Sequence, residues 1–66
     1  MKIRYDSKVD AMSITLARGK YDNTRKITDS ILVDEDKDGK ILAIEILDAT
    51  ENIPAFDPKH ISLQTS

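Results

Sequence analysis

The chain has 66 residues, no cysteine, ten basic and twelve acidic residues, and a formal net charge of −2. One small domain over residues 1–66 is expected at this length, and the lack of cysteine excludes disulfides and thiolate zinc sites. The balanced charge argues against nucleic acid as a partner. No apolar run reaches the roughly 20 residues of a membrane helix, and the first residues lack a signal-peptide apolar segment. We therefore expect no membrane contact and a cytoplasmic location.

A domain of this size buries only about 60% of the surface of its unfolded chain. At about 25 cal/mol per Å², this burial roughly cancels an ordering entropy of about 1.5 kcal/mol per residue. With disulfides and thiolate zinc excluded, association with another chain is the remaining common source of stability. Length and composition therefore favour a homo-oligomer, most simply a dimer.

Alternating apolar residues predict two strands at the start of the chain. The residues that mark them are Ile3 and Tyr5, then Met12, Ile14 and Leu16. Between the strands, Asp6 and Asp10 are expected to hold the bend, because their carboxylates can accept N–H bonds from the residues that follow. An acid and base pair in an active site is the alternative interpretation of these two residues.

Residues 18–26 are predicted to form a polar loop. They carry four cations and one aromatic residue, namely Arg18, Lys20, Arg25, Lys26 and Tyr21. Such a group could contact an anion or stack on an RNA base. A solvated surface loop is the simpler interpretation of this composition.

A longer hairpin is predicted over residues 27–48, with its turn at residues 36–39. Apolar residues occupy both odd and even positions of its arms, so both faces of the hairpin are expected to be apolar and covered. The tail of the chain can cover one face, and we expect a second copy or another protein to cover the other. The interface candidates are Ile31, Val33, Ile41, Leu42, Ile44, Ile46 and Leu47.

Two registers of this hairpin are compatible with its turn residues. A two-residue turn at positions 38 and 39 places Val33 opposite Ile44. A type I turn centred on positions 37 and 38, with Gly39 in the left-handed region, places Leu32 opposite Ile44. We favour the second register, because Asp36 suits the first position of a type I turn and Gly39 suits its last.

The stretch from Asp34 to Glu45 also matches the calcium-loop pattern D-x-[DN]-x-[DN]-G-x5-E. In a hairpin, however, Glu45 lies roughly 20 Å from the turn at about 3.4 Å per residue, too far to share an ion with Asp38. We therefore predict no resident metal and no cofactor. The candidates for a weaker cation site are Asp34, Asp36 and Asp38.

The tail, residues 50–66, contains two prolines that forbid one continuous helix. Asp57 followed by Pro58 resembles a helix start, whereas Ile61 and Leu63 alternate with polar residues as in an edge strand. The expected fold is mainly β. It is a single antiparallel four-stranded meander of two hairpins, with a short C-terminal helix or edge strand packed on one face.

Three blocks of the chain also carry a family resemblance. They are Tyr5-Asp6 with Asp10-Ala11-Met12, Val33-Asp34-Glu35-Asp36 with Gly39-Lys40-Ile41, and Ala43-Ile44-Glu45-Ile46-Leu47-Asp48-Ala49. Over residues 3–49 the chain is similar to the small bacterial and archaeal proteins grouped as domain of unknown function 2283. This resemblance implies a short stand-alone bacterial protein without established catalytic residues. The toxin–antitoxin-like gene pairs of some relatives suggest a protein partner.

These observations lead to three hypotheses of function. The first is a non-catalytic interaction module that self-associates or caps a partner protein, for which the family resemblance suggests an antitoxin-like role. The alternative is a calcium-binding module that uses the Asp-rich turn. The third is an enzyme that gathers Asp6, Asp10 or Glu45 across subunits, which we do not expect, because the sequence offers no pair of nucleophile and base. His60, the only histidine, has neither a second metal ligand nor an evident orienting group.

Overall fold

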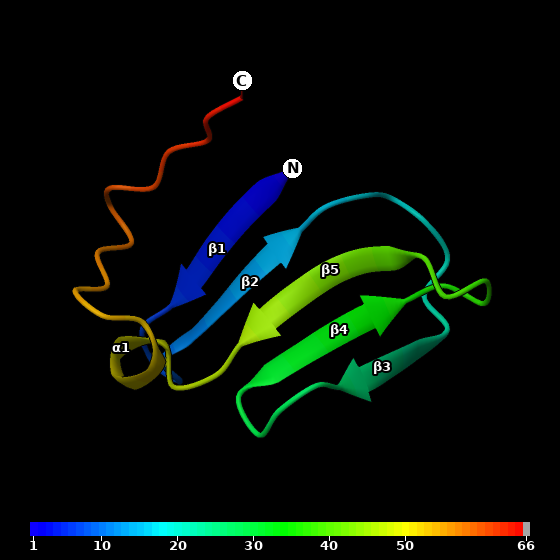
Figure 1. Cartoon of the computed structure of the whole chain (residues 1–66), viewed down its shortest axis with the longest axis horizontal. Helices are drawn as coiled ribbons and strands as arrows, with labels where there is room; N and C mark the ends of the chain where they lie inside the picture. The colour runs from blue at the N-terminus through cyan, green and yellow to red at the C-terminus, as the bar shows by residue number, and fades with distance from the viewer. Residues whose placement is uncertain (66) are drawn as a thin grey trace.

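The computed structural model describes residues 1–65 and contains five strands and one short helix (Figure 1). The elements are β1 (Lys2–Asp6), β2 (Ala11–Thr15), β3 (Asn23–Lys26), β4 (Ile31–Glu35), β5 (Ile41–Ile46) and α1 (Ala49–Asn52). The strands form one antiparallel sheet in the order β1-β2-β5-β4-β3. The prediction of a mainly β chain is confirmed. Ser66, the last residue of the predicted domain and tail, lies outside the described residues.

The prediction of a four-stranded meander is wrong in strand number and in strand order. After the β1-β2 hairpin the chain crosses the sheet to its far edge, and β3, β4 and β5 then return as a meander until β5 pairs with β2. This long crossing followed by three hairpin-linked strands is a Greek-key arrangement. It places the two strands richest in aliphatic residues, β4 and β5, at the interior of the sheet.

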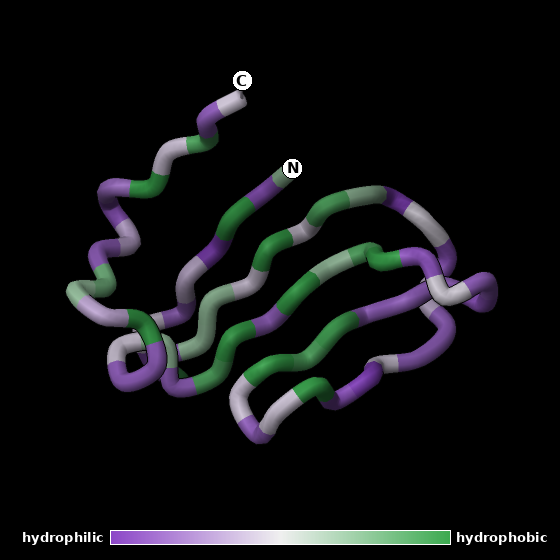
Figure 2. The backbone as a smooth tube through the Cα atoms, viewed as in Figure 1, coloured by the Kyte–Doolittle hydropathy of each residue, from purple (hydrophilic) through white to green (hydrophobic). Residues whose placement is uncertain are grey.

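β3 lies within the segment that we predicted to be a loop. Its four residues, Asn23 to Lys26, are all polar and all exposed, and Figure 2 shows this strand as hydrophilic. An edge strand that buries neither face needs no apolar residues, so hydrophobic alternation cannot reveal it. β3 is held by its ladder with β4, in which Arg25 lies opposite Val33.

The tip of the β4-β5 hairpin has the turn that we favoured. Gly39 N–H donates to the Asp36 carbonyl and Asp36 N–H donates to the Lys40 carbonyl, both at 3.0 Å. Gly39 has φ of 78° in the left-handed region. The turn therefore centres on positions 37 and 38, as a type I turn with a following left-handed glycine does.

The pairing beyond the tip is nevertheless that of the other register. Val33 lies opposite Ile44 and Ile31 opposite Ile46, not Leu32 opposite Ile44. The two findings are compatible because the ladder shifts between Asp34 and Glu35, where Leu42 is an extra residue on β5. We call this irregularity the Leu42 bulge.

The Leu42 bulge decides which residues share a face, because residues directly opposite one another in a ladder point to the same side. It aligns the odd aliphatic positions of β4 with the even positions of β5. The ladders with β2 and β1 extend the same side. The resulting apolar face consists of Ile3, Tyr5, Met12, Ile14, Ile31, Val33, Ile44 and Ile46. Leu42 is added to it by its alternation with Ile44 and Ile46 along β5. The other side is the polar face.

The prediction of two apolar faces is therefore wrong. Opposite-face positions of the interior strands are largely polar, and they include Ser13, Thr15, Asp34 and Glu45. Leu32 is the large aliphatic residue that the ladders place among them. The sequence pattern misled us because it cannot show a bulge that shifts one arm by one residue.

The chain after β5 turns through α1 and then lies against the apolar face at its β1 end. The Phe56 ring packs edge-on against Tyr5 with 5.1 Å between the ring centroids. Ile53 and Phe56 also line a groove with Met12 and Ile14. Residues 57–64 form neither the predicted helix nor the predicted edge strand. Instead the Asp57 side chain accepts the Lys59 N–H at 3.0 Å and closes a turn.

The hydrophobic core is thin. The buried apolar residues are Met12, Val33, Leu42 and Ala49, and no large side chain of residues 1–65 is fully buried. Within that same range, no helix has the length and apolar character needed to cross a membrane.

Replacing Gly39 by alanine is expected to lower the free energy of unfolding by about 1 kcal/mol, because an L side chain is strained in the left-handed region. A Cβ at this position would meet nothing within 4 Å, so the loss reports backbone strain alone. Gly39→Asn is the control and should lose less, since asparagine tolerates this region. Urea denaturation measures both variants, and an alanine variant as stable as the natural protein would contradict the turn.

Candidate interaction surface

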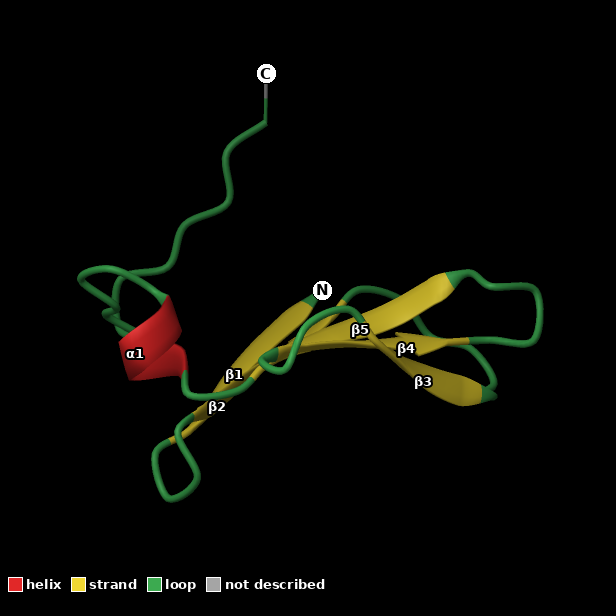
Figure 3. Ribbon diagram, turned by 60° about the horizontal axis from the view of Figure 1, so that its bottom comes forward, coloured by secondary structure: helices red, strands yellow, loops and turns green. Residues whose placement is uncertain are grey.

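The apolar face belongs to a single layer of strands. Figure 3 shows the sheet nearly edge-on, with α1 at one end and without a second layer of strands or helices. Five of the seven predicted interface residues lie on this face, namely Ile31, Val33, Leu42, Ile44 and Ile46. Ile41 is 44% exposed beside the bulge. Leu47 follows β5 and donates its N–H to the Ser30 carbonyl at 2.8 Å.

The two ends of the apolar face are covered by the chain itself. At the β1 end the tail packs on Tyr5 through Phe56. At the other end the crossing segment runs over Leu42, where a Cβ on Gly19 would lie 2.7 Å from the Leu42 Cδ2. Between these ends, Ile31 and Ile44 are only half-buried. The chain therefore covers this face incompletely, because Ile3 remains 36% exposed and Ile31 and Ile44 are not fully buried, whereas Val33 is buried.

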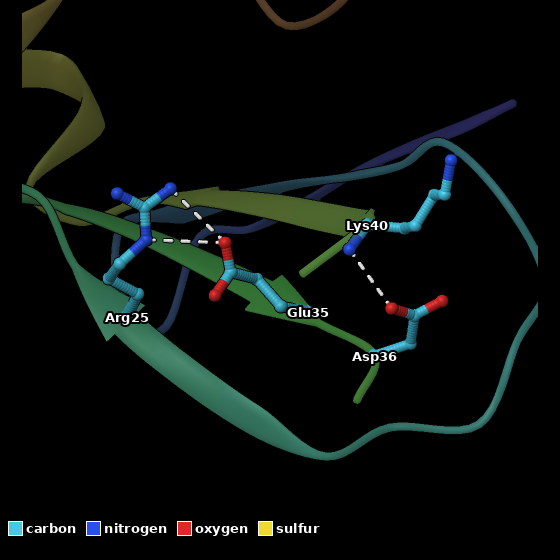
Figure 4. Close-up of polar contacts among 4 residues, drawn as sticks. All are labelled: Arg25, Glu35, Asp36 and Lys40. Carbon is cyan, nitrogen blue, oxygen red and sulfur yellow. Dashed lines mark hydrogen bonds and ion pairs between the residues drawn. The ribbon is translucent and has the colours of Figure 1, made fainter. Parts of the chain in front are cut away.

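One ion pair lies at the rim of the apolar face (Figure 4). Arg25 Nε and Nη2 lie 3.2 and 3.1 Å from the Glu35 Oε2. Glu35 is 8% exposed, whereas the Arg25 side chain is 57% exposed. Sequence analysis missed this pair. The face of Glu35 could have been predicted, because Glu35 continues the odd positions of Ile31 and Val33 along β4. The position of Arg25 could not have been predicted in this way, because β3 was not expected.

The Asp-rich turn uses its carboxylates for local structure. Asp36 Oδ1 accepts the Lys40 N–H at 2.9 Å (Figure 4). It also accepts the Asp38 N–H at 2.9 Å. Asp34 Oδ1 accepts the Thr24 hydroxyl at 2.7 Å across the β3-β4 ladder. These bonds give both acidic residues a local structural role: Asp36 holds the turn, and Asp34 bonds across the β3-β4 ladder.

The predicted metal candidates are not brought together as a set of ligands. Among residues 1–65, no group of three or more histidine, aspartate or glutamate side chains is arranged to hold a metal ion. Glu45 lies in the middle of β5, opposite Leu32 and Ser13, and strands rather than helices flank the turn. The hypothesis of a cation-binding module gains no supporting observation from this geometry.

Asp10 joins three segments of the chain. Its carboxylate accepts the Tyr5 hydroxyl at 2.7 Å, the Thr50 hydroxyl at 2.7 Å and the Thr50 N–H. Its carbonyl accepts the Ala49 N–H at 2.9 Å. We call this cluster the Asp10 joint, and it ties the β1-β2 turn to the start of α1.

The Asp10 joint was not predicted. The expectation for Asp6 is confirmed, since its Oδ1 accepts the Lys8 N–H at 3.0 Å. Asp10 instead bonds a residue 40 positions away. Its φ of 53° places it in the left-handed region, which aspartate tolerates better than most residues. No local sequence signal reports a bond of that separation.

The bonds of the Asp10 joint shift two ionisation equilibria. The Thr50 hydroxyl bond, followed by the Tyr5 hydroxyl bond, holds the pKa of Asp10 below its ordinary value of 3.8. The bond to Asp10 raises the pKa of Tyr5 above 10.0, because the phenol that donates to a carboxylate resists deprotonation. Both shifts preserve the hydrogen-bonded form of the joint.

His60 has a neighbour that the sequence did not reveal. Its Nδ1 contacts Asp57 Oδ2 within the turn of the tail, and both side chains are exposed. The carboxylate can orient the imidazole, but the pair lies on the surface, beside the groove at Phe56. Asp6, Asp10 and His60 therefore lie in three separate local arrangements.

The model of one protein family, described as protein of unknown function (DUF2283), matches residues 2–49. The match begins with β1 and ends at the first residue of α1, so it contains the whole sheet. The chain belongs to this family. Neither a curated protein nor a solved structure matches the chain. The family resemblance of the sequence is confirmed, and membership of DUF2283 assigns no chemistry to the residues described above.

In this DUF2283 protein, Asp10→Asn should reduce the loss of stability on acidification. The unfolded state binds more protons than the folded state below about pH 4, because folding lowers the pKa of Asp10 from 3.8. Its stabilising contribution is therefore present above that value and is lost as the pH falls through the folded-state pKa. Urea unfolding at neutral pH and at pH values below 3.8 measures the difference.

The asparagine variant keeps a carbonyl acceptor and tolerates the left-handed backbone, so its stability should depend less on pH across that window. Thr50→Val removes the hydroxyl that contributes most to the shift and should give an intermediate slope. Equal slopes in the natural protein and in Asp10→Asn would show that the joint does not bind Asp10 as a carboxylate.

Proposed function

We propose that the protein is a non-catalytic protein-interaction module that associates with a second copy through its apolar face. The observation that carries the proposal is the incomplete burial of four isoleucines on the apolar face of a single-layered sheet, namely Ile14, Ile31, Ile44 and Ile46. A sheet with one apolar side is normally packed against a second layer. A second copy stacked face to face supplies that layer.

The energetics favour such stacking. Full burial of one isoleucine side chain contributes about 1.5–3 kcal/mol, and Ile14, Ile31, Ile44 and Ile46 are all only half-buried. In a twofold dimer each of these side chains is present twice, so even partial burial adds to several kcal/mol before the cost of association. The thin core of the single chain gives the same contact a stabilising role in folding.

The charge distribution suits an identical partner. The charged residues that the ladders place on the apolar side are Arg25 and Glu35, which neutralise each other at the rim. Two copies can therefore approach face to face without bringing like charges together. A different protein that covers the same face is the alternative occupant, in keeping with the family resemblance.

Substituting Ile31 by threonine tests the face contact. Threonine keeps β propensity but adds a hydroxyl to the apolar face. The dissociation constant of the dimer should therefore rise about tenfold. Leu32→Thr is the matched control, because Leu32 is the next residue of β4 and points to the polar face. Light scattering and sedimentation measure the dissociation constants.

The control should leave association unchanged while showing how much stability a threonine costs in this strand. A natural protein that is strictly monomeric at high concentration would overturn the proposal. Equal weakening by Ile31→Thr and Leu32→Thr would show that association does not use the apolar face.

A further inference from the structure

The β1 edge of the sheet is open. Among residues 1–65, β1 pairs only with β2, so the N–H and C=O groups on its outer side have no strand partner in this part of the chain. The tail runs alongside β1 (Figure 1), but no backbone hydrogen bond joins residues 53–65 to this strand. The groove between them is lined by Met1, Ile3, Tyr5, Pro58, Lys59 and Ile61. An unpaired edge of this kind is a template for another strand.

The opposite edge of the sheet is protected against its own copy. The charged residues of β3 are Arg25 and Lys26, both positive. Two β3 strands that paired with each other would gather cations without any anion, and like charges across a ladder are destabilising. β1 differs, because Lys2 and Asp6 place opposite charges at its two ends.

We infer that β1 pairs antiparallel with β1 of a second copy. A twofold axis at Arg4 overlaps the two strands along their full length. In this register Lys2 lies opposite Asp6 of the second copy, and Ile3 lies opposite Tyr5 of the second copy. Opposite charges and aromatic–aliphatic pairs are both favourable across a ladder. The twofold axis makes each favourable pair occur twice.

The strand is self-complementary in its faces as well as in its charges. Lys2, Arg4 and Asp6 lie on the polar face, and Ile3 and Tyr5 lie on the apolar face. The proposed register keeps every pair on one face, as an antiparallel ladder requires. Arg4 opposite Arg4 of the second copy is the single unfavourable pair, and it makes this position a sensitive reporter.

Exposed apolar side chains gather at this edge. Met1 is 65% exposed, Ile61 is 44% exposed and Leu63 is 74% exposed. The tail rises from one side of the sheet (Figure 3), and Phe56 and Ile61 line a groove with Ile14 of the apolar face. In the paired arrangement each tail would meet the edge of the second copy and reduce the exposure of these residues.

Edge pairing is independent of the face contact proposed above. Its twofold axis runs perpendicular to the sheet, whereas face-to-face stacking uses an axis that lies between two sheets. When both contacts form, each layer contains ten strands, and the assembly closes as a tetramer where the two axes intersect. When only one forms, the product is a dimer with a different interface.

A cysteine at position 4 tests the register directly, because the chain contains no other cysteine. In the paired strands the two copies of residue 4 lie about 4.5–5.5 Å apart at their Cα atoms, within reach of a disulfide. Arg4→Cys is expected to form a covalent dimer under mild oxidation, at least about tenfold faster than the control variants. Non-reducing electrophoresis and mass spectrometry measure the product.

Two control variants make the test specific. In Lys2→Cys the two thiols belong to residues about 14 Å apart along the ladder, so they should not link to each other. Asn23→Cys places the thiol on β3 and should not link either. Equal rates for the three variants, or a faster rate for Lys2→Cys, would overturn the proposed pairing.

A charge exchange provides a second measurement. Lys2→Glu sets two carboxylates opposite each other in both symmetry-related pairs and should raise the dissociation constant about tenfold. The double variant Lys2→Glu with Asp6→Lys restores opposite charges and should restore association. Asp6→Asn controls for the turn bond to Lys8, and thermal melting confirms folding of each variant.

The same variants separate this inference from the proposed function. Association that survives Lys2→Glu but is lost in Ile31→Thr supports the face contact and overturns edge pairing. The reverse result supports edge pairing and overturns the face contact. A charge exchange without rescue also overturns edge pairing, and a strictly monomeric natural protein overturns both.

Discussion

The Leu42 bulge is the constraint on which the rest of the sheet depends. With the register set by the turn alone, Ile31 and Val33 would share a side with Glu45 and Ala43. One extra residue on β5 brings them instead beside Ile46 and Ile44. The bulge is held from its other side, where the Leu42 carbonyl accepts the N–H groups of Leu16 and Ala17 at 2.8 and 3.2 Å. The segment that follows β2 thus helps to hold the register of the β4-β5 hairpin.

The unified apolar side has consequences for association. A sheet that was apolar on both sides would need two covers, whereas this sheet needs one, and the chain itself supplies only part of it. The Asp10 joint fixes the cover at one end by tying α1 to the β1-β2 turn, and Gly19 permits the close crossing over Leu42 at the other. The incomplete burial of the apolar face follows from the length of the chain, because the remaining residues cannot form a second layer.

Sequence reasoning predicted those features that depend on neighbouring residues. Alternation located β1 and β2, and apolar runs on either side of a turn located β4 and β5. The residues at 36–39 predicted a turn with a left-handed Gly39. The same reasoning placed Glu45 far from that turn. It failed for β3, whose polar residues carry no alternation, and for residues 57–64, where proline and apolar spacing favoured elements that do not form. Arg25–Glu35 and Asp10–Thr50 depend on contacts between segments that no local pattern joins.

By itself, the sequence determined a small, mainly β chain with a charged hairpin tip and a family resemblance. These properties follow from composition and from spacing over a few residues, which restrict the backbone locally. Only the tertiary structure decided that the apolar residues lie on one side, that β5 pairs with β2, and that β1 is an open edge with opposite charges at its ends. The reason is physical: a strand's side-chain period is two, so a single extra residue elsewhere in the ladder reverses which face every following position occupies.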